Sequence, residues 1–266
     1  MIKRQADAWK EGILQMIISI RGQNYSGKST IMVHLASVLG RDKSVLLIDL
    51  NSKTDRSLRD MLLNSNKISN GVDNYVNEKL INDNLSKEEF LRCCQEVKKN
   101  IMIMSAPAIK TPTDKQIVEL IIDANKYFDY VFIEMQANDE RFLSLDSSID
   151  IDIQTFKQHQ NEIENLYLSF TQKSRFVIAQ YDASINFNLE KIIARLSKVA
   201  NNLNETLVFP VPYHSDVIND MNEKLLFYTM DNSETDYVKA INKLCESFGY
   251  VQAPVKKGFK LWKTKS

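Results

Sequence analysis

The segment with the clearest chemistry lies near the start of the chain, where two of its seven glycines stand five positions apart. Residues 22–29 read Gly-Gln-Asn-Tyr-Ser-Gly-Lys-Ser, which is the G-x-x-x-x-G-K-[ST] pattern of a phosphate-binding loop. Glycines let the backbone fold tightly around a phosphate, so that successive N–H groups and the N-terminus of the next helix point at the anion. The pattern predicts that Lys28 reaches the β- and γ-phosphates of a nucleotide and that the Ser29 hydroxyl binds Mg²⁺.

The sequence around this loop predicts the strand and the helix that such a loop needs. Residues 13–20 form a continuous apolar run with β-branched side chains, which is typical of a strand buried on both faces. After the loop, Met32, Leu35, Ala36 and Leu39 recur at helical spacing. We therefore predict strand, loop and helix in that order, rather than a glycine-rich turn without function.

Two acidic residues follow further predicted strands. Asp49 stands near the end of the apolar run 44–50, and Glu134 near the end of the run 130–135. Ligands of parallel sheets bind beyond the carboxyl ends of the strands. We therefore predict that both carboxylates lie beside the phosphates, where they hold the water molecules of a bound Mg²⁺.

Apolar runs alternate with helical patterns along the whole chain. This alternation predicts an α/β protein, a three-layer P-loop fold with a mostly parallel central sheet and helices on both faces. We expect further strands at 101–104, 175–179 and 206–209, and further helices at 87–99, 113–127, 158–170, 189–202 and 235–248. No linker rich in Pro, Gly or Ser divides the chain. We expect one nucleotide-binding domain at 13–250, a leader at 1–12 and a basic, aromatic tail at 251–266.

The composition excludes two broad classes of protein. Hydrophobic residues make up 44% and charged residues 26% of the 266 positions, which excludes a chain disordered throughout. No apolar run approaches the ~18–20 residues that span a bilayer. The three cysteines, two of them adjacent, form no disulfide framework, and the first residues lack the pattern of a signal peptide. We therefore expect a cytoplasmic protein.

Charge is distributed unevenly along the chain. Basic and acidic residues number 34 each, yet the last fourteen residues hold five lysines and no acid, so the rest of the chain carries a net charge of −5. Lysines interleaved with aromatic side chains suit an anionic membrane interface; the residues concerned are Lys256, Lys257, Phe259, Lys260 and Trp262. A solvated tail and a segment that binds DNA or a protein are the alternatives, and the acidic body disfavours DNA.

The quoted residues resemble a known family. The run MIISIRGQNYSGKSTIMVHLASVLGRDKSVLLIDLNSKTDRSL is similar to the opening of the MinD/ParA ATPases, P-loop proteins with a deviant Walker A motif. Later segments follow in the order of that family, namely GVDNYVNEKL, NIMIMSAPA, YFDYVFIEM, FVIAQYD and FPVPYHSDVINDMNEKLLFY. The resemblance covers about residues 16–248 and looks nearest to the CpaE/TadZ branch, which serves pilus assembly and secretion.

The resemblance implies a function and a set of ligand-binding residues. Proteins of this family form ATP-bound homodimers that engage a membrane or DNA until hydrolysis, often stimulated by a protein partner, separates the subunits. We expect an organiser that positions or recruits a pilus, secretion, conjugation or partition apparatus, cytoplasmic and peripheral at the inner face of the membrane. By position, ATP or ADP would contact Gly22, Gln23, Ser26, Gly27, Lys28, Ser29, Thr30, Gln180 and Pro212, and Mg²⁺ would be held by Ser29, Asp49 and Glu134.

Four positions depart from the family pattern or compensate for a departure. Gln23 stands where the family has its signature lysine, and Asn51 where it commonly has a second acid that positions the attacking water. Glu134 replaces the usual aspartate, while Asp55 is an acid that can take over water orientation. With Lys28 and Asp49 retained, we expect an ATPase with weak or partner-dependent hydrolysis. The alternatives are a non-hydrolysing, nucleotide-bound scaffold and a subfamily of normal activity; a tyrosine kinase is disfavoured because the C-terminus lacks a tyrosine cluster.

Overall fold

The structure, a computed structural model, describes residues 15–51, 58–62, 71–107, 111–159, 163, 173–200, 203–232 and 234–251. The predicted leader at 1–12 and the predicted water-orienting Asp55 lie outside the described residues. The same holds for the five proposed membrane-contacting residues of the tail, Lys256, Lys257, Phe259, Lys260 and Trp262.

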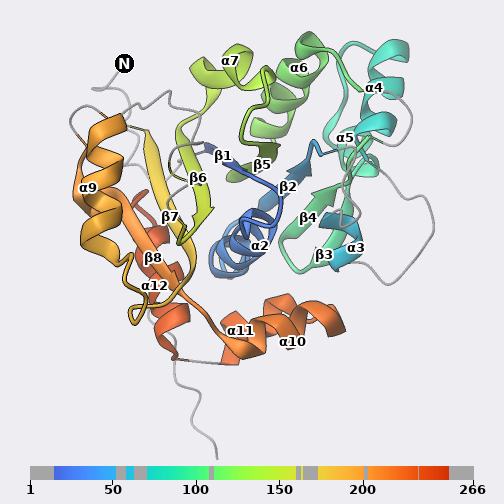
Figure 1. Cartoon of the computed structure of the whole chain (residues 1–266). Helices are drawn as coiled ribbons and strands as arrows, with labels where there is room; N and C mark the ends of the chain where they lie inside the picture. Colours follow the sequence, from blue (N-terminus) through green and yellow to red (C-terminus); the bar gives the residue numbers. More distant parts are fainter. Residues whose placement is uncertain are drawn as a thin grey trace, which may run out of the picture.

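Eight strands of the described part form a single sheet in the order β3-β4-β2-β5-β1-β6-β7-β8 (Figure 1). Their bounds are β1 Met16–Gly22, β2 Val45–Asp49, β3 Gln95–Lys98, β4 Ile101–Met104, β5 Tyr130–Gln136, β6 Ile151–Lys157, β7 Ser174–Tyr181 and β8 Val208–Pro212. All neighbours are parallel except β3 and β4. The carboxyl ends of β1, β2 and β5 therefore meet at one edge, where parallel sheets bind ligands.

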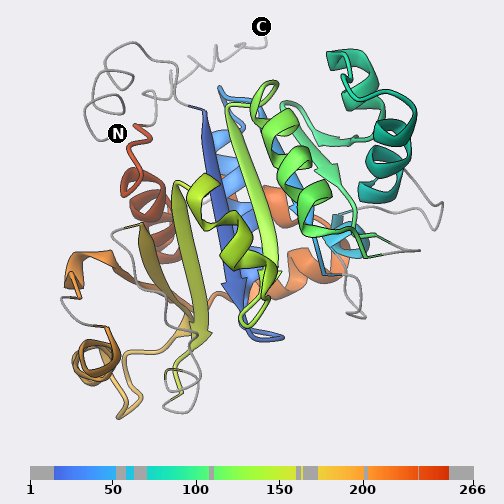
Figure 2. The same ribbon diagram turned by 90° about the horizontal axis from the view of Figure 1, so that it is seen from above.

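Helices cover both faces of this sheet (Figure 2). One face carries α2 (Lys28–Leu39), α3 (Leu58–Leu62), α10 (Ser215–Glu223), α11 (Leu226–Asn232) and α12 (Asp236–Glu246). The other carries α4 (Val72–Ile81), α5 (Lys87–Arg92), α6 (Asp114–Asn125), α7 (Arg141–Leu145) and α9 (Leu189–Val199). Two 3₁₀ turns occupy Asp146–Ser148 and Glu205–Leu207. The predicted three-layer α/β fold is confirmed.

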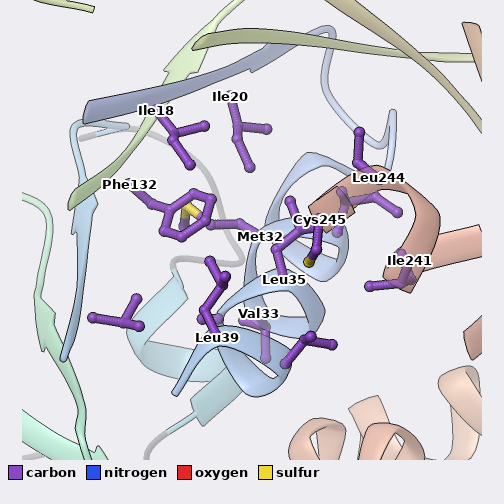
Figure 3. Close-up of a cluster of buried hydrophobic side chains, with 14 of the residues drawn as sticks. Ile18, Ile20, Met32, Val33, Leu35, Leu39, Phe132, Ile241, Leu244 and Cys245 are labelled. Carbon is purple, nitrogen blue, oxygen red and sulfur yellow. The ribbon is translucent and has the colours of Figure 1, made fainter. Parts of the chain in front are cut away.

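Helix α2 lies at the centre of the larger hydrophobic core (Figure 3). Most of its residues are buried, because it packs against the sheet on one side and against α11 and α12 on the other. Met32, Leu35 and Leu39 are fully buried here, and burying one such side chain contributes roughly 1.5–3 kcal/mol. The helix that follows the glycine-rich loop is thus fixed along its whole length.

Strand β6 was missed by the sequence prediction, because polar residues interrupt its apolar pattern. Asp152 and Gln154 lie on the face toward α7, yet both are buried. Asp152 accepts hydrogen bonds from Arg21 Nε at 2.8 Å, from Arg21 Nη2 at 2.6 Å and from Ser19 Oγ at 2.7 Å. Buried polar groups that are paired in this way are compatible with a central strand.

The predicted helix at 87–99 was wrong in its second half. The helix ends at Arg92, and residues 95–98 form β3, which turns back on β4. Asn100, in the hairpin turn, has a φ of 66°, a left-handed conformation that asparagine tolerates in tight turns. Most of the predicted helix at 158–170 lies outside the described residues. Among those described, no helix is both long enough and apolar enough to span a membrane.

Candidate functional site

The loop between β1 and α2 has the backbone geometry that its glycines predict. A Cβ atom on Gly22 would lie 2.2 Å from Ser26 Oγ and 2.6 Å from the main-chain oxygen of Thr155, so only glycine fits. Gly27 precedes α2 with a φ of 86°, in the left-handed region that favours glycine. The loop therefore bends tightly and leads directly into the N-terminus of α2, the arrangement in which backbone N–H groups bind a phosphate.

Side chains from the two strands flanking β1 hold this loop. The hydroxyls of Ser26 and Thr155 are 2.7 Å apart, and Thr155 Oγ1 donates to the main-chain oxygen of Arg21 at 3.2 Å. On the other side, Gln136 Nε2 donates to Asn24 Oδ1 at 3.0 Å. Thr155 was not predicted as a site residue because β6 was not recognised from the sequence. The Ser26 side chain is buried and engaged with Thr155, so it leaves the phosphate to the loop backbone.

Lys28 is buried and folds back over the loop. Its Nζ donates to the main-chain oxygen of Gln23 at 3.4 Å and lies 3.9 Å from Glu134 Oε1. Desolvation lowers the pKa of Lys28, while the charges of Glu134 and Asp49 act in the opposite direction. The ammonium group thus stands between the loop and the acids, where it can reach a phosphate.

The two predicted acids lie side by side at the edge of the sheet. Asp49 and Glu134 are register partners on the parallel strands β2 and β5. Glu134 Oε1 accepts a hydrogen bond from Ser29 Oγ at 2.6 Å, and Asp49 accepts from the N–H groups of Asn51 at 2.8 Å and Leu58 at 3.0 Å. Burial raises the pKa of both carboxyl groups, and the charge of Asp49 raises that of Glu134 further.

These residues fit a hard divalent cation held jointly with a phosphate. Ser29, Asp49 and Glu134 supply oxygen donors, the type that Mg²⁺ prefers. The buried Oδ1 atom of Asn51, next to them, has no hydrogen-bond partner within the described part of the chain. No group of three or more His, Cys, Asp or Glu residues that could hold a metal ion occurs among the described residues. Phosphate oxygens and water would complete the coordination of an ion held by Ser29, Asp49 and Glu134.

A cavity adjoins the loop on the side away from the two acids. It brings together Gly27 and Thr30 from the predicted loop residues and Gln180 and Pro212, the two other residues expected to contact the nucleotide. Gln180 has a φ of 58° at a register shift between β7 and β8, so the strand is distorted where it meets the cavity. The remaining lining residues are Ile31, Ala179, Val211, Tyr213, His214, Val217, Ile218, Met221 and Tyr237.

Most walls of this cavity were not found from the sequence. Helix α10 and the loop before it supply five lining residues, and α12 supplies Tyr237. The five are Tyr213, His214, Val217, Ile218 and Met221. These residues show no motif spacing, and the segment of α12 was predicted only to be a helix. Gln23, by contrast, is exposed on the loop, as its place in the motif suggests.

Comparison with known proteins gives no match at the level of sequence families: no family model and no curated protein sequence matches the chain. Solved structures do match. A ParA family ATPase from Chlorobium tepidum superposes with a TM-score of 0.71 at 14% identity, covering 89% of this chain and 100% of that one. The fold is that of the MinD/ParA ATPases.

Two further matches were solved with nucleotides. The septum site-determining protein MinD of Pyrococcus horikoshii, complexed with Mg-ADP, has a TM-score of 0.66 at 16% identity over 89% of this chain and 96% of that chain. An ATP complex of a McdA variant from Cyanothece has a TM-score of 0.66 at 17% identity, covering 90% and 99%. At such identities the likeness concerns the fold.

Proposed function

We propose that the protein binds ATP and ADP with Mg²⁺ at this site and acts as a dimeric organiser of the MinD/ParA type. The observation that carries the proposal is the convergence of Lys28, Ser29, Asp49 and Glu134 around a tightly bent glycine loop at the start of α2. The nucleotide complexes of the MinD and McdA structures, which share this fold, support it.

Each part of the site has a role in this proposal. The N–H groups of residues 22–30 and Lys28 bind the phosphates, and Ser29, Asp49 and Glu134 hold Mg²⁺ directly or through water. The bound ion would neutralise charge on the phosphate oxygens. Gln180 and Pro212 border the cavity that takes the base. The single domain at 13–250, with its leader and tail, belongs to the same proposal.

The organising role is proposed from the fold and from the resemblance of the sequence. The dimer would position or recruit a pilus, secretion, conjugation or partition apparatus, nearest in type to the CpaE/TadZ branch, and would engage an unidentified protein partner. We place it in the cytoplasm and, through the basic, aromatic tail at 251–266, at the inner face of the membrane. The acidic body makes DNA the less favoured surface.

Hydrolysis is proposed to be weak or partner-dependent. Gln23 is neutral where the family has a lysine, and a cation at that point can contribute several kcal/mol to the transition state of phosphoryl transfer. Asn51 is a carboxamide, and its main-chain N–H is bound to Asp49. Asp55 remains our choice for orienting the water. The same two replacements favour the second function, a nucleotide-bound scaffold that does not hydrolyse ATP.

A chase of bound nucleotide tests these proposals. The protein is incubated with labelled ATP and Mg²⁺, free nucleotide is removed, and the bound species is identified over several hours. Lys28→Ala is the test variant; Lys115→Ala, whose side chain is 86% exposed on α6, is the control. We expect retention in the wild type and in the control and none in Lys28→Ala. Equal retention in all three proteins would refute the site.

The fate of the retained nucleotide separates the two functions. Slow conversion to ADP supports the organiser that hydrolyses ATP and makes Asp55→Ala the next variant to measure. ATP that stays intact for hours, even after a candidate partner or lipid vesicles are added, supports the scaffold.

A further inference from the structure

Tyr237 joins the base cavity to the helix that carries the phosphate-binding loop. Its side chain lines the cavity but is almost completely buried. Its hydroxyl lies 2.6 Å from Nδ1 of His34, which is on α2, and the two rings meet edge to face at 5.3 Å. Figure 3 shows α12, which carries Tyr237, lying against α2. Tyr237 thus lines the cavity and is also bonded to α2 through its hydroxyl.

The partners of His34 fix the direction of this hydrogen bond. Nε2 lies 3.0 Å from the main-chain oxygen of Leu226, which only accepts, so Nε2 carries the proton and donates. Burial lowers the pKa of His34 to about 4, so the ring is neutral near pH 7 and its Nδ1 is an acceptor. The Tyr237 hydroxyl therefore donates to Nδ1 and has no proton left for a ligand.

His34 belongs to a row of side chains, on α2 and directly after it, that hold α11. Ser37 Oγ donates to the main-chain oxygen of Phe227 at 3.3 Å, and Arg41 Nη2 donates to that of Met230 at 2.8 Å. Of these three side chains, only His34 also bonds to a residue that lines the cavity. The row thus contains a matched control, since the hydrogen bond of Ser37 goes to α11 at Phe227, which does not line the cavity.

We propose that Tyr237, held by His34, is a positioning residue that makes the site prefer a nucleoside phosphate, with its flat base, over phosphate chains alone. This inference rests on the proposed nucleotide binding. Because its hydroxyl is anchored, the Tyr237 ring stands as a fixed wall of the cavity before any ligand enters. A ring without that anchor must be ordered when the base binds, which costs affinity. The binding of the phosphate groups does not involve this cost.

The size of the effect follows from the loss of one hydrogen bond. A net contribution of about 1 kcal/mol corresponds to about fivefold in Kd. Calorimetry would measure the binding of Mg²⁺-ADP and of Mg²⁺-tripolyphosphate. The readout is the ratio of the two Kd values. A general loss of folded protein lowers both apparent capacities and leaves this ratio unchanged. Tyr237→Phe is expected to weaken the binding of ADP about fivefold and to leave the binding of tripolyphosphate unchanged.

Two replacements of His34 separate positioning from packing. In His34→Asn, the amide oxygen takes the position of the imidazole Nδ1 and still accepts the hydrogen bond from Tyr237. In His34→Gln, the amide nitrogen takes the position of the imidazole Nε2 and still donates to the main-chain oxygen of Leu226. Each loses one bond of the pair. We expect His34→Asn to keep the wild-type preference for ADP and His34→Gln to behave like Tyr237→Phe. Ser37→Ala, the control, is expected to keep the preference.

The outcomes are distinct for the inference and for the proposed function. If the wild type binds both ligands and Tyr237→Phe keeps its ADP preference, the inference is wrong. If both His34 variants lose the preference for ADP equally, His34 is a packing residue and the inference is also wrong. If the wild type binds neither ligand, the proposed nucleotide site itself fails.

Discussion

The phosphate end and the base end of the proposed site are assembled from different parts of the chain. At the phosphate end, one continuous loop meets acids from the two nearest strands on its side, and the contacts are hydrogen bonds and ion pairs. At the base end, the walls come from α2, β7, β8, α10 and α12, and most of the lining is apolar or aromatic. The first end depends on particular atoms, and the second depends on the packing of helices.

This difference predicts two kinds of response to substitution. Polar groups at the phosphate end support the part of the site that every phosphate ligand uses, so losing one weakens the binding of all such ligands together. The base end spreads its contacts over many side chains, so a single change has a graded effect that is specific to the base.

The largest effect is expected at the ion pair that supports β1 and β6. Arg21 and Asp152 are both nearly fully buried, and the Arg21 guanidinium lies 3.5 Å from the centroid of the Phe142 ring. Asp152→Ala leaves a buried, unpaired cation, which costs about 3–5 kcal/mol of the unfolding free energy. Urea unfolding measures it. Asp152→Asn keeps hydrogen-bond acceptors and should lose less; a loss below about 1 kcal/mol in Asp152→Ala would contradict the prediction.

The second-largest effect is expected in the pH dependence of the unfolding free energy, through His34 at the base end. The pKa of His34 is about 4 in the folded protein and about 6.5 in an unfolded chain, so the unfolded chain binds more protons between these values. The unfolding free energy therefore falls as the pH drops from 7 to 4, by about 3 kcal/mol from this residue.

His34→Asn removes this contribution, and urea unfolding at several pH values measures it. The carboxyls of Asp49 and Glu134, whose pKa values burial raises, act in the opposite direction. They are present in both proteins, so the difference between wild type and variant isolates His34. Parallel stability curves for the two proteins would show that His34 is not buried in its neutral form.

The same contrast explains what could be predicted from the sequence. The loop, Asp49, Glu134 and the central strands were predictable because each is a local pattern: a spaced pair of glycines, or an apolar run that ends in an acid. Strand β6 was not, since Asp152 breaks its apolar run and its burial depends on Arg21 and Ser19, which are far away in sequence. Thr155 was lost with it.

The base cavity lay further beyond the reach of sequence patterns. Gln180 and Pro212 were placed by resemblance to a family, and the structure brings both to one cavity. Tyr237 gave no signal, because a tyrosine on an amphipathic helix is ordinarily a core residue. Its proposed role depends on His34, a lone histidine on α2. Residues that meet only after helices pack leave no mark in local spacing.

The smallest effect is expected when the loop loses its anchor on β6. Thr155→Val keeps the shape of the side chain but removes the hydroxyl that bonds to Ser26 and to the main chain of Arg21. The loop must then be ordered when a phosphate binds, so we expect Mg²⁺-ADP and Mg²⁺-tripolyphosphate to weaken together, about fivefold. Calorimetry of both ligands measures this, with Thr155→Ser as the control that keeps the hydroxyl. An unchanged ratio of the two Kd values in Thr155→Val would be the reverse of the result expected for Tyr237→Phe. Weaker binding of ADP alone would show that the two ends of the site are not independent.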